Sequence, residues 1–87
     1  MTMTAEQVLD VVRRAVVRVL EVESSSVTRQ TSFKADLAAD SLALVEIIEL
    51  VEEELAPLAP IGFHIADEDL DALTTVGEAV DYAVAQL

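Results

Sequence analysis

The sequence contains no cysteine and a single histidine, His64, among its 87 residues. Without cysteine the chain has no disulfide, no thiolate metal ligand and no thiol nucleophile. One histidine without a second histidine or a cysteine is not typical of a metal site. The spacing of the other polar residues assembles no nucleophile–base or acid–base pair. We therefore expect no metal site, no catalytic residue and a protein that is not an enzyme.

Aromatic residues and long apolar runs are also missing. The chain has two phenylalanines, one tyrosine and no tryptophan, whereas 53% of its residues are hydrophobic, mainly Ala, Val and Leu. A chain of this length buries only a little more than about 60% of its unfolded surface. We therefore expect one domain over residues 1–87, made of closely packed helices. No apolar run is long enough to span a membrane, and the N-terminus lacks a signal pattern, which predicts a cytoplasmic protein.

Basic residues are scarce and confined to the first part of the chain. Five lysines and arginines stand against 17 acidic residues, a formal net charge of −12, and no basic residue follows Lys34 apart from the histidine. Such a surface would repel a phosphate backbone, so nucleic acid is a poor partner. It would attract proteins with basic patches. The charge can also simply keep a small apolar-rich protein soluble, and both explanations stay open.

The most informative stretch is residues 36–55, DLAADSLALVEIIELVEEEL. Its apolar residues recur at the spacing of one helix face, while the glutamates fall away from that face. The predicted buried stripe consists of Leu44, Ile47, Ile48, Val51 and Leu55. Asp40 directly precedes this run and fits a helix N-cap. Ser41 then lies in the first turn of a helix over 41–55, where the positive end of the helix dipole would favour a phosphodiester on its oxygen.

A long first helix is predicted over residues 5–22. Thr4 and Gln7 fit a capping box at its start. The inward stripe consists of Val8, Val11, Val12, Ala15, Val19 and Val22. Arg14 lies on the polar side, where Asp10 and Glu21 are its candidate ion-pair partners.

Two helices are predicted near the C-terminus. An acidic first turn favours a short helix over 67–73. A second capping box, Thr75 with Glu78, precedes a helix over 76–86. The inward stripe of this last helix consists of Val76, Ala79, Val80, Ala83, Val84 and Leu87.

Two connections separate these helices. The first is rich in serine and threonine, and Val27, Phe33 and Leu37 are the residues expected to hold it to the core. The second, APLAPIGFHI, contains both prolines, which exclude a helix interior, and is unusually apolar for a loop. It either packs against the end of the bundle or acts as a flap that contacts a partner or covers cargo.

The 36–55 segment resembles the attachment segment of the acyl carrier proteins. In that family the serine of an Asp-Ser-Leu triplet receives 4′-phosphopantetheine from coenzyme A, and the triplet matches Asp40, Ser41 and Leu42. The resemblance implies an all-α fold, a small four-helix bundle of the acyl-carrier type with a long loop between the first two helices and a short third helix. Read without the resemblance, Asp40 and Ser41 are an ordinary helix cap with an exposed serine.

Two residues depart from the family pattern. Many relatives have glycine at the position of Ala38, where the backbone turns. Because alanine tolerates positive φ poorly, a turn of different shape is expected here. Many relatives also have an acidic residue at the position of Ala43, so the negative charge beside Ser41 is weaker and the set of docking partners can differ.

The resemblance implies a discrete carrier, and we expect a monomer with no membrane interaction. A phosphopantetheinyl transferase would modify Ser41, and the thiol of the arm would hold acyl groups as thioesters for fatty-acid or polyketide biosynthesis. Acyl-loading and synthase enzymes with basic docking patches would bind one side of the second helix. The expected docking residues are Leu42, Val45, Glu46, Glu49 and Glu53. The alternatives are a solvated glutamate face, an aminoacyl or peptidyl carrier of a nonribosomal pathway, and an unmodified acidic helical interaction module.

Overall fold

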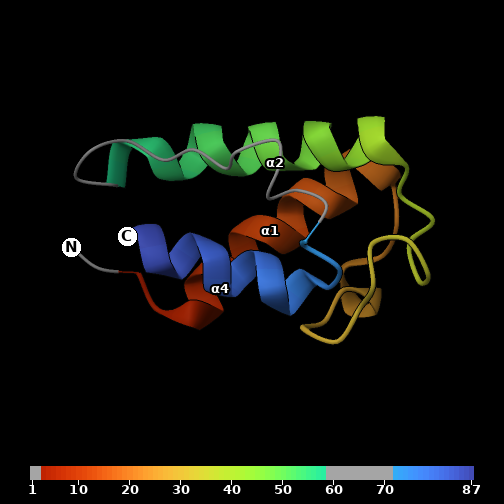
Figure 1. Ribbon diagram of the computed structural model, residues 1–87, viewed down its shortest axis with the longest axis horizontal. Coiled ribbons are helices and arrows are strands. Elements are labelled where there is room, and N and C mark those ends of the chain that lie inside the picture. Colours follow the sequence, from red (N-terminus) through yellow and green to blue (C-terminus); the bar gives the residue numbers. More distant parts are fainter. Residues whose placement is uncertain (1–2, 59–71) are drawn as a thin grey trace.

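The computed structural model of the chain describes residues 3–58 and 72–87 (Figure 1). This part is helical: α1 (Ala5–Leu20), the 3₁₀ turn η1 (Ser24–Ser26), α2 (Ser41–Leu55), the 3₁₀ turn η2 (Ala56–Leu58) and α4 (Val76–Gln86). Helix α1 packs against both α2 and α4 and lies between them in Figure 1. The predicted all-α fold is confirmed for this part of the chain, and the helices over 41–55 and 76–86 have the predicted bounds.

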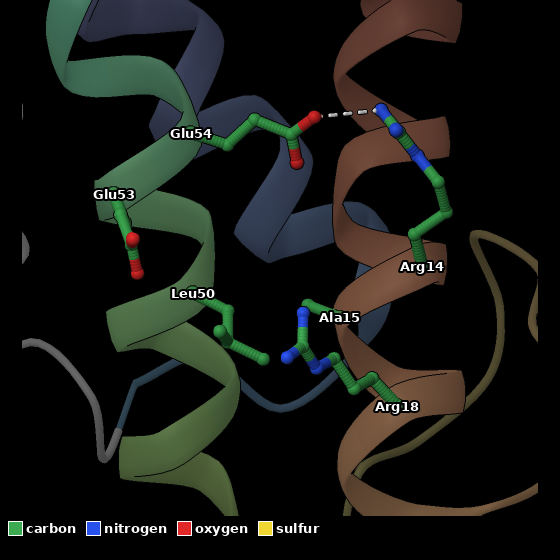
Figure 2. Close-up of a pocket in the computed structure, with 6 residues that line it drawn as sticks. All are labelled: Arg14, Ala15, Arg18, Leu50, Glu53 and Glu54. Atoms are coloured by element: carbon green, nitrogen blue, oxygen red, sulfur yellow. Dashed lines mark ion pairs between the residues drawn. The ribbon is translucent and has the colours of Figure 1, made fainter.

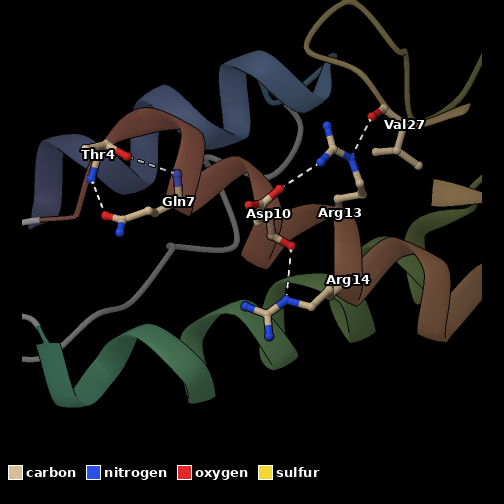
Figure 3. A network of polar contacts seen from close by, with 6 residues as sticks. All are labelled: Thr4, Gln7, Asp10, Arg13, Arg14 and Val27. Atoms are coloured by element: carbon tan, nitrogen blue, oxygen red, sulfur yellow. Dashed lines mark hydrogen bonds and ion pairs between the residues drawn. The ribbon is translucent and has the colours of Figure 1, made fainter. Parts of the chain in front are cut away.

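Helix α1 begins at the predicted capping box. The Thr4 backbone N–H donates to Oε1 of Gln7 at 2.8 Å, and the Gln7 N–H donates to Oγ1 of Thr4 at 3.2 Å (Figure 3). Its buried face consists of Val8, Val11, Val12, Ala15 and Val16. The helix ends at Leu20 rather than at residue 22, because Glu21 takes a left-handed conformation with φ of 55° and closes the last turn onto Val17. The C-terminal bound of the predicted first helix was therefore wrong.

The ion pairs of α1 also differ from those predicted. Asp10 pairs with Arg13 at 2.8 Å rather than with Arg14. The Nε atom of Arg14 instead donates to the backbone oxygen of Asp10 at 3.3 Å (Figure 3), and its Nη2 atom pairs with Glu54 of α2 at 3.0 Å. Each pair is exposed and contributes at most about 1 kcal/mol. The bridge to Glu54 nevertheless links two helices that the local spacing could not relate.

The connection from α1 to α2 is held to the core as predicted. Val27 and Phe33 are buried, and Leu37 is half-buried against the same core. Full burial of a side chain such as Phe33 stabilises the fold by roughly 1.5–3 kcal/mol. The buried Thr31 hydroxyl is satisfied, because it donates to the Ser26 carbonyl at 3.1 Å and accepts from the Thr28 N–H at 2.8 Å.

The same connection is hydrogen-bonded to the start of α4. The Phe33 N–H donates to the Thr74 carbonyl at 3.1 Å, and the Val76 N–H donates to the Thr31 carbonyl at 2.9 Å. The Gly77 N–H donates to the Arg29 carbonyl at 2.9 Å. A Cβ at position 77 would lie 2.8 Å from that carbonyl oxygen, so only glycine allows the two backbones to approach this closely.

Helices α2 and α4 bury the predicted faces. The α2 residues Leu44, Ile47, Ile48, Val51 and Leu55 are all buried. The capping box of Thr75 and Glu78 is present at the start of α4. Val76, Ala79, Val80 and Ala83 of its stripe are buried, and Val84 and Leu87 are partly buried against the core.

Several predictions lie outside the described residues. They concern His64, most of the short helix over 67–73 and most of the apolar connection after α2. At the edges of this gap, Leu73 is buried and Leu58 is 47% exposed. Within residues 3–58 and 72–87, no helix has the length and apolarity needed to cross a membrane.

Candidate functional site

Ser41 is the first residue of α2, and the structure places it as the sequence predicted. The side chain of Asp40 caps the helix, since its Oδ1 atom accepts a hydrogen bond from the Ala43 N–H at 2.8 Å. Asp40 and Ser41 are both exposed. No described residue forms a hydrogen bond with the Ser41 side chain. The hydroxyl is therefore open to another enzyme, at a helix end that favours negative charge.

The turn in front of Ser41 is built by backbone hydrogen bonds. The Asp36 and Leu37 N–H groups both donate to the Ser32 carbonyl at 3.1 Å, and the Ala39 N–H donates to the Phe33 carbonyl at 2.8 Å. The Asp36 carboxylate accepts from the Ser32 N–H at 2.7 Å. Because Phe33 is buried, these bonds tie the approach to Ser41 to the core.

Ala38 lies in this turn and has φ of 52°. The expectation that alanine would avoid a left-handed conformation here was wrong. An L-residue with a Cβ pays roughly 1–2 kcal/mol for such a conformation. The hydrogen bonds on both sides of Ala38 hold the turn in place and offset this unfavourable energy.

The predicted docking residues share one side of α2. Leu42 is 68% exposed, Val45 is half-buried, and Glu46, Glu49 and Glu53 are exposed. The three glutamates line a shallow hollow of about 390 Å³ together with Leu50 and with two residues of α1, Arg18 and Val19. The structure thus brings α1 to the edge of the predicted docking side, which the sequence reasoning missed.

A second hollow of about 450 Å³ continues along the α1–α2 junction. Its lining consists of Arg14, Ala15, Arg18, Leu50, Glu53 and Glu54 (Figure 2). The Arg14–Glu54 ion pair closes one end, and the Arg18 side chain extends between the helices toward Leu50 (Figure 2). Helical spacing places Glu49 and Glu53 on one side of α2, but nothing in the sequence indicates that Arg18 faces them.

The described residues contain no group of three or more His, Cys, Asp or Glu side chains that could hold a metal ion. Their polar groups also form no nucleophile–base pair around Ser41.

Comparison with known proteins decides the family. The chain matches the family described as "Phosphopantetheine attachment site" over residues 10–83. It is also 43% identical, over 82 residues, to an acyl carrier protein of Rubrobacter xylanophilus, and the match covers 94% of each chain. The chain belongs to the acyl carrier protein family.

The fold agrees with this assignment. The structure is similar to a solved acyl carrier protein from Enterococcus faecalis, with a TM-score of 0.75 and 36% sequence identity. The match covers 98% of this chain and 100% of the other. Acyl carrier proteins hold acyl groups on 4′-phosphopantetheine and work with a phosphopantetheinyl transferase and with synthase enzymes. They are carriers, which fits the expectation that the chain is not an enzyme.

The described residues fit the prosthetic group of this family. Covalent attachment through phosphate needs an accessible hydroxyl in a setting that tolerates negative charge. Ser41 offers an exposed hydroxyl and the N-terminal end of α2 offers free backbone N–H groups. The Asp40 carboxylate is turned to the Ala43 N–H, so its charge is partly offset by the helix end.

Proposed function

We propose that Ser41 is the attachment residue for 4′-phosphopantetheine and that the chain carries acyl intermediates for fatty-acid or polyketide-type biosynthesis. The observation that carries the proposal is the exposed hydroxyl of Ser41 at the first position of α2, directly after the Asp40 cap. The Asp-Ser-Leu triplet of residues 40–42 is the part of the sequence that resembles the family's attachment motif.

The chain's own contribution is to present the attachment oxygen. The hydrogen-bonded turn before Ser41 and the buried stripe behind it hold the start of α2 against the core. The transferase joins this oxygen to the arm's phosphate in coenzyme A, the pyrophosphate bond breaks, adenosine 3′,5′-bisphosphate leaves, and the hydroxyl proton is lost to the solvent or to a base of the transferase. The arm supplies a thiol that holds an acyl group as an electrophilic thioester, and its length and flexibility raise the local concentration of cargo at each partner's site.

One side of α2 is the surface that we assign to partner docking. Leu42 offers an apolar contact beside the attachment residue, and Glu46, Glu49 and Glu53 continue along the helix. Exposed charge pairs around a small apolar contact give weak and fast binding. A carrier needs this property, because it must leave one enzyme before it reaches the next.

An intact-mass measurement tests the attachment. The purified protein is incubated with coenzyme A and a promiscuous phosphopantetheinyl transferase. We expect a gain of one phosphopantetheine in the wild type and in Ser25→Ala, and none in Ser41→Ala. Ser25 is an exposed serine of η1 and serves as the matched control. A wild type that gains no mass would favour the unmodified interaction module instead.

The kind of cargo needs a second measurement. The acidic side of α2 favours acyl over aminoacyl cargo, which makes an aminoacyl or peptidyl carrier the second candidate. Mass analysis of the loaded protein from its native cell distinguishes a fatty-acyl, a polyketide and an aminoacyl thioester.

A further inference from the structure

We infer that Arg18 selects among docking partners by forming an ion pair with an aspartate or glutamate of the enzyme that binds α2. This inference rests on the proposed function. It adds a residue of α1 to a docking surface that would otherwise consist of α2 alone. It also specifies the partner's surface, which must present a carboxylate beside the lysines and arginines that meet the α2 glutamates.

Arg18 differs from the other arginines in having no partner within the described chain. Arg13 pairs with Asp10 at 2.8 Å, Arg14 with Glu54 at 3.0 Å and Arg29 with Asp81 at 2.8 Å. No ion pair of Arg18 exists among the residues that the structure describes. Its side chain instead extends into the hollow between the two helices toward Leu50 (Figure 2).

The position of Arg18 places this cation on the docking surface. Arg18 lines the hollow that contains Glu46, Glu49 and Glu53, and it also lines the neighbouring hollow on the outer side of α1. Helices α1 and α2 run in opposite directions (Figure 1), so the C-terminal part of α1 lies beside the first half of α2. Glu46 follows Ser41 by five residues, about 7.5 Å along the helix axis.

Charge complementarity identifies the occupant. A uniformly basic partner patch that meets Glu46 and Glu49 would bring a second cation close to Arg18. The glutamates that line the same hollow as Arg18 would then be paired with the partner's cations and could not offset this repulsion. A partner cation close to Arg18 opposes binding, whereas a partner carboxylate at the same place forms an ion pair with Arg18. Arg18 therefore disfavours uniformly basic surfaces and favours surfaces of mixed charge, which is how a repulsive element creates specificity.

The test compares two single substitutions with the same net charge. Arg18→Ala and Gln7→Glu each change the formal charge from −12 to −13. Gln7→Glu keeps the acceptor of the capping box and lies eleven residues away, about 16 Å along α1 and beyond the Debye length of about 8 Å at physiological salt. The holo forms are assayed with the acyl-loading enzyme of the same organism, and kcat/KM is measured at low and high salt.

We expect Arg18→Ala to lower kcat/KM by roughly three- to tenfold at low salt, and less at high salt, while Gln7→Glu changes it less than about twofold. Arg18→Glu should lower it further. A partner variant with one surface Asp or Glu changed to Lys should raise the rate of Arg18→Glu toward the wild-type value. The same partner variant should not raise the rate of the wild-type carrier. The thermal midpoints of all forms should agree.

Three results would overturn the inference. The first is an Arg18→Ala rate equal to that of Gln7→Glu or faster than the wild type. The second is a slower Arg18→Glu that no partner charge reversal rescues. The third is a loss of rate that follows a lowered thermal midpoint. A wild type that accepts the arm and the acyl group while Arg18 has no effect refutes only this inference. A wild type that accepts no arm refutes the proposed function and the inference together.

Discussion

Helices α2 and α4 both pack against α1, but they use different residues to do so. The buried face of α4 is made of small residues, Val76, Gly77, Ala79, Val80 and Ala83, and its start is hydrogen-bonded to the connection before α2. The buried face of α2 is made of leucine, isoleucine and valine, and its outer side carries the exposed glutamates and Leu42.

The difference assigns separate tasks to the two helices. Close backbone approach anchors α4 to the connection, so changes there should affect stability first. Larger side chains hold α2 to the core from one side only, which leaves its opposite side free for docking. Changes on that side should affect partner reactions and leave the fold intact. Three predictions test this contrast.

The largest effect is expected for Gly77→Ala, on the α4 side. Alanine has the better helix propensity, by about 1 kcal/mol in a helix interior. The new Cβ would, however, lie 2.8 Å from the Arg29 carbonyl oxygen and would push the connection off α4. We expect the free energy of unfolding to fall by about 1–3 kcal/mol, measured by denaturant titration.

The control for this change is Ala85→Gly, at an exposed position of the same helix. It should lower stability by about 1 kcal/mol or less through propensity alone. A Gly77→Ala protein that is more stable than the wild type would show that propensity, and not the contact with Arg29, dominates.

The second prediction concerns the α2 side and the double variant Glu46→Lys and Glu49→Lys. Reversing both charges should slow acyl loading by roughly tenfold at low salt, because basic patches on partners would then be repelled. Stability should change by less than about 0.5 kcal/mol, since both residues are exposed. The assay is kcat/KM with the acyl-loading enzyme, together with a thermal melt.

Glu6→Lys with Glu23→Lys is the matched control, because both positions are exposed and off α2. Each pair of reversals changes the formal net charge from −12 to −8, since each reversal adds two charges. Equal rates in the two double variants would mean that total charge, and not the α2 surface, governs docking.

The smallest effect is expected at Ala38, between the two regions. Ala38→Gly removes the Cβ penalty of the left-handed conformation and adds chain entropy to the unfolded state. We expect a net gain of at most about 1 kcal/mol in the free energy of unfolding. Ala35→Gly, in the same turn but without positive φ, should instead lower stability. Equal losses in both variants would show that Ala38 carries no conformational strain.

Much of the candidate site could be predicted from local sequence. The Asp40 cap, the first-turn position of Ser41 and the buried stripe of α2 all depend on residues three or four positions apart. The two capping boxes of α1 and α4 depend on the same short spacing. The end of α1 was missed because no glycine marks the left-handed residue at Glu21.

Contacts between distant segments followed from tertiary structure alone. Arg14 pairs with Glu54, forty residues away, although Asp10 and Glu21 lie closer in the sequence. Gly77 meets Arg29 only because the connection folds back onto α4. Ala38 takes a conformation that its own side chain disfavours, because hydrogen bonds on both sides impose it.

The sequence by itself determined the bounds of α2 and α4, the exposed cap at Ser41 and the resemblance to acyl carrier proteins. Caps and helical periodicity are set within a few residues. The tertiary structure decided which charges face one another across α1 and α2. Those relations depend on how two helices pack, and helical spacing within either one carries no information about the other. Arg18 beside the glutamates of α2 is the clearest case.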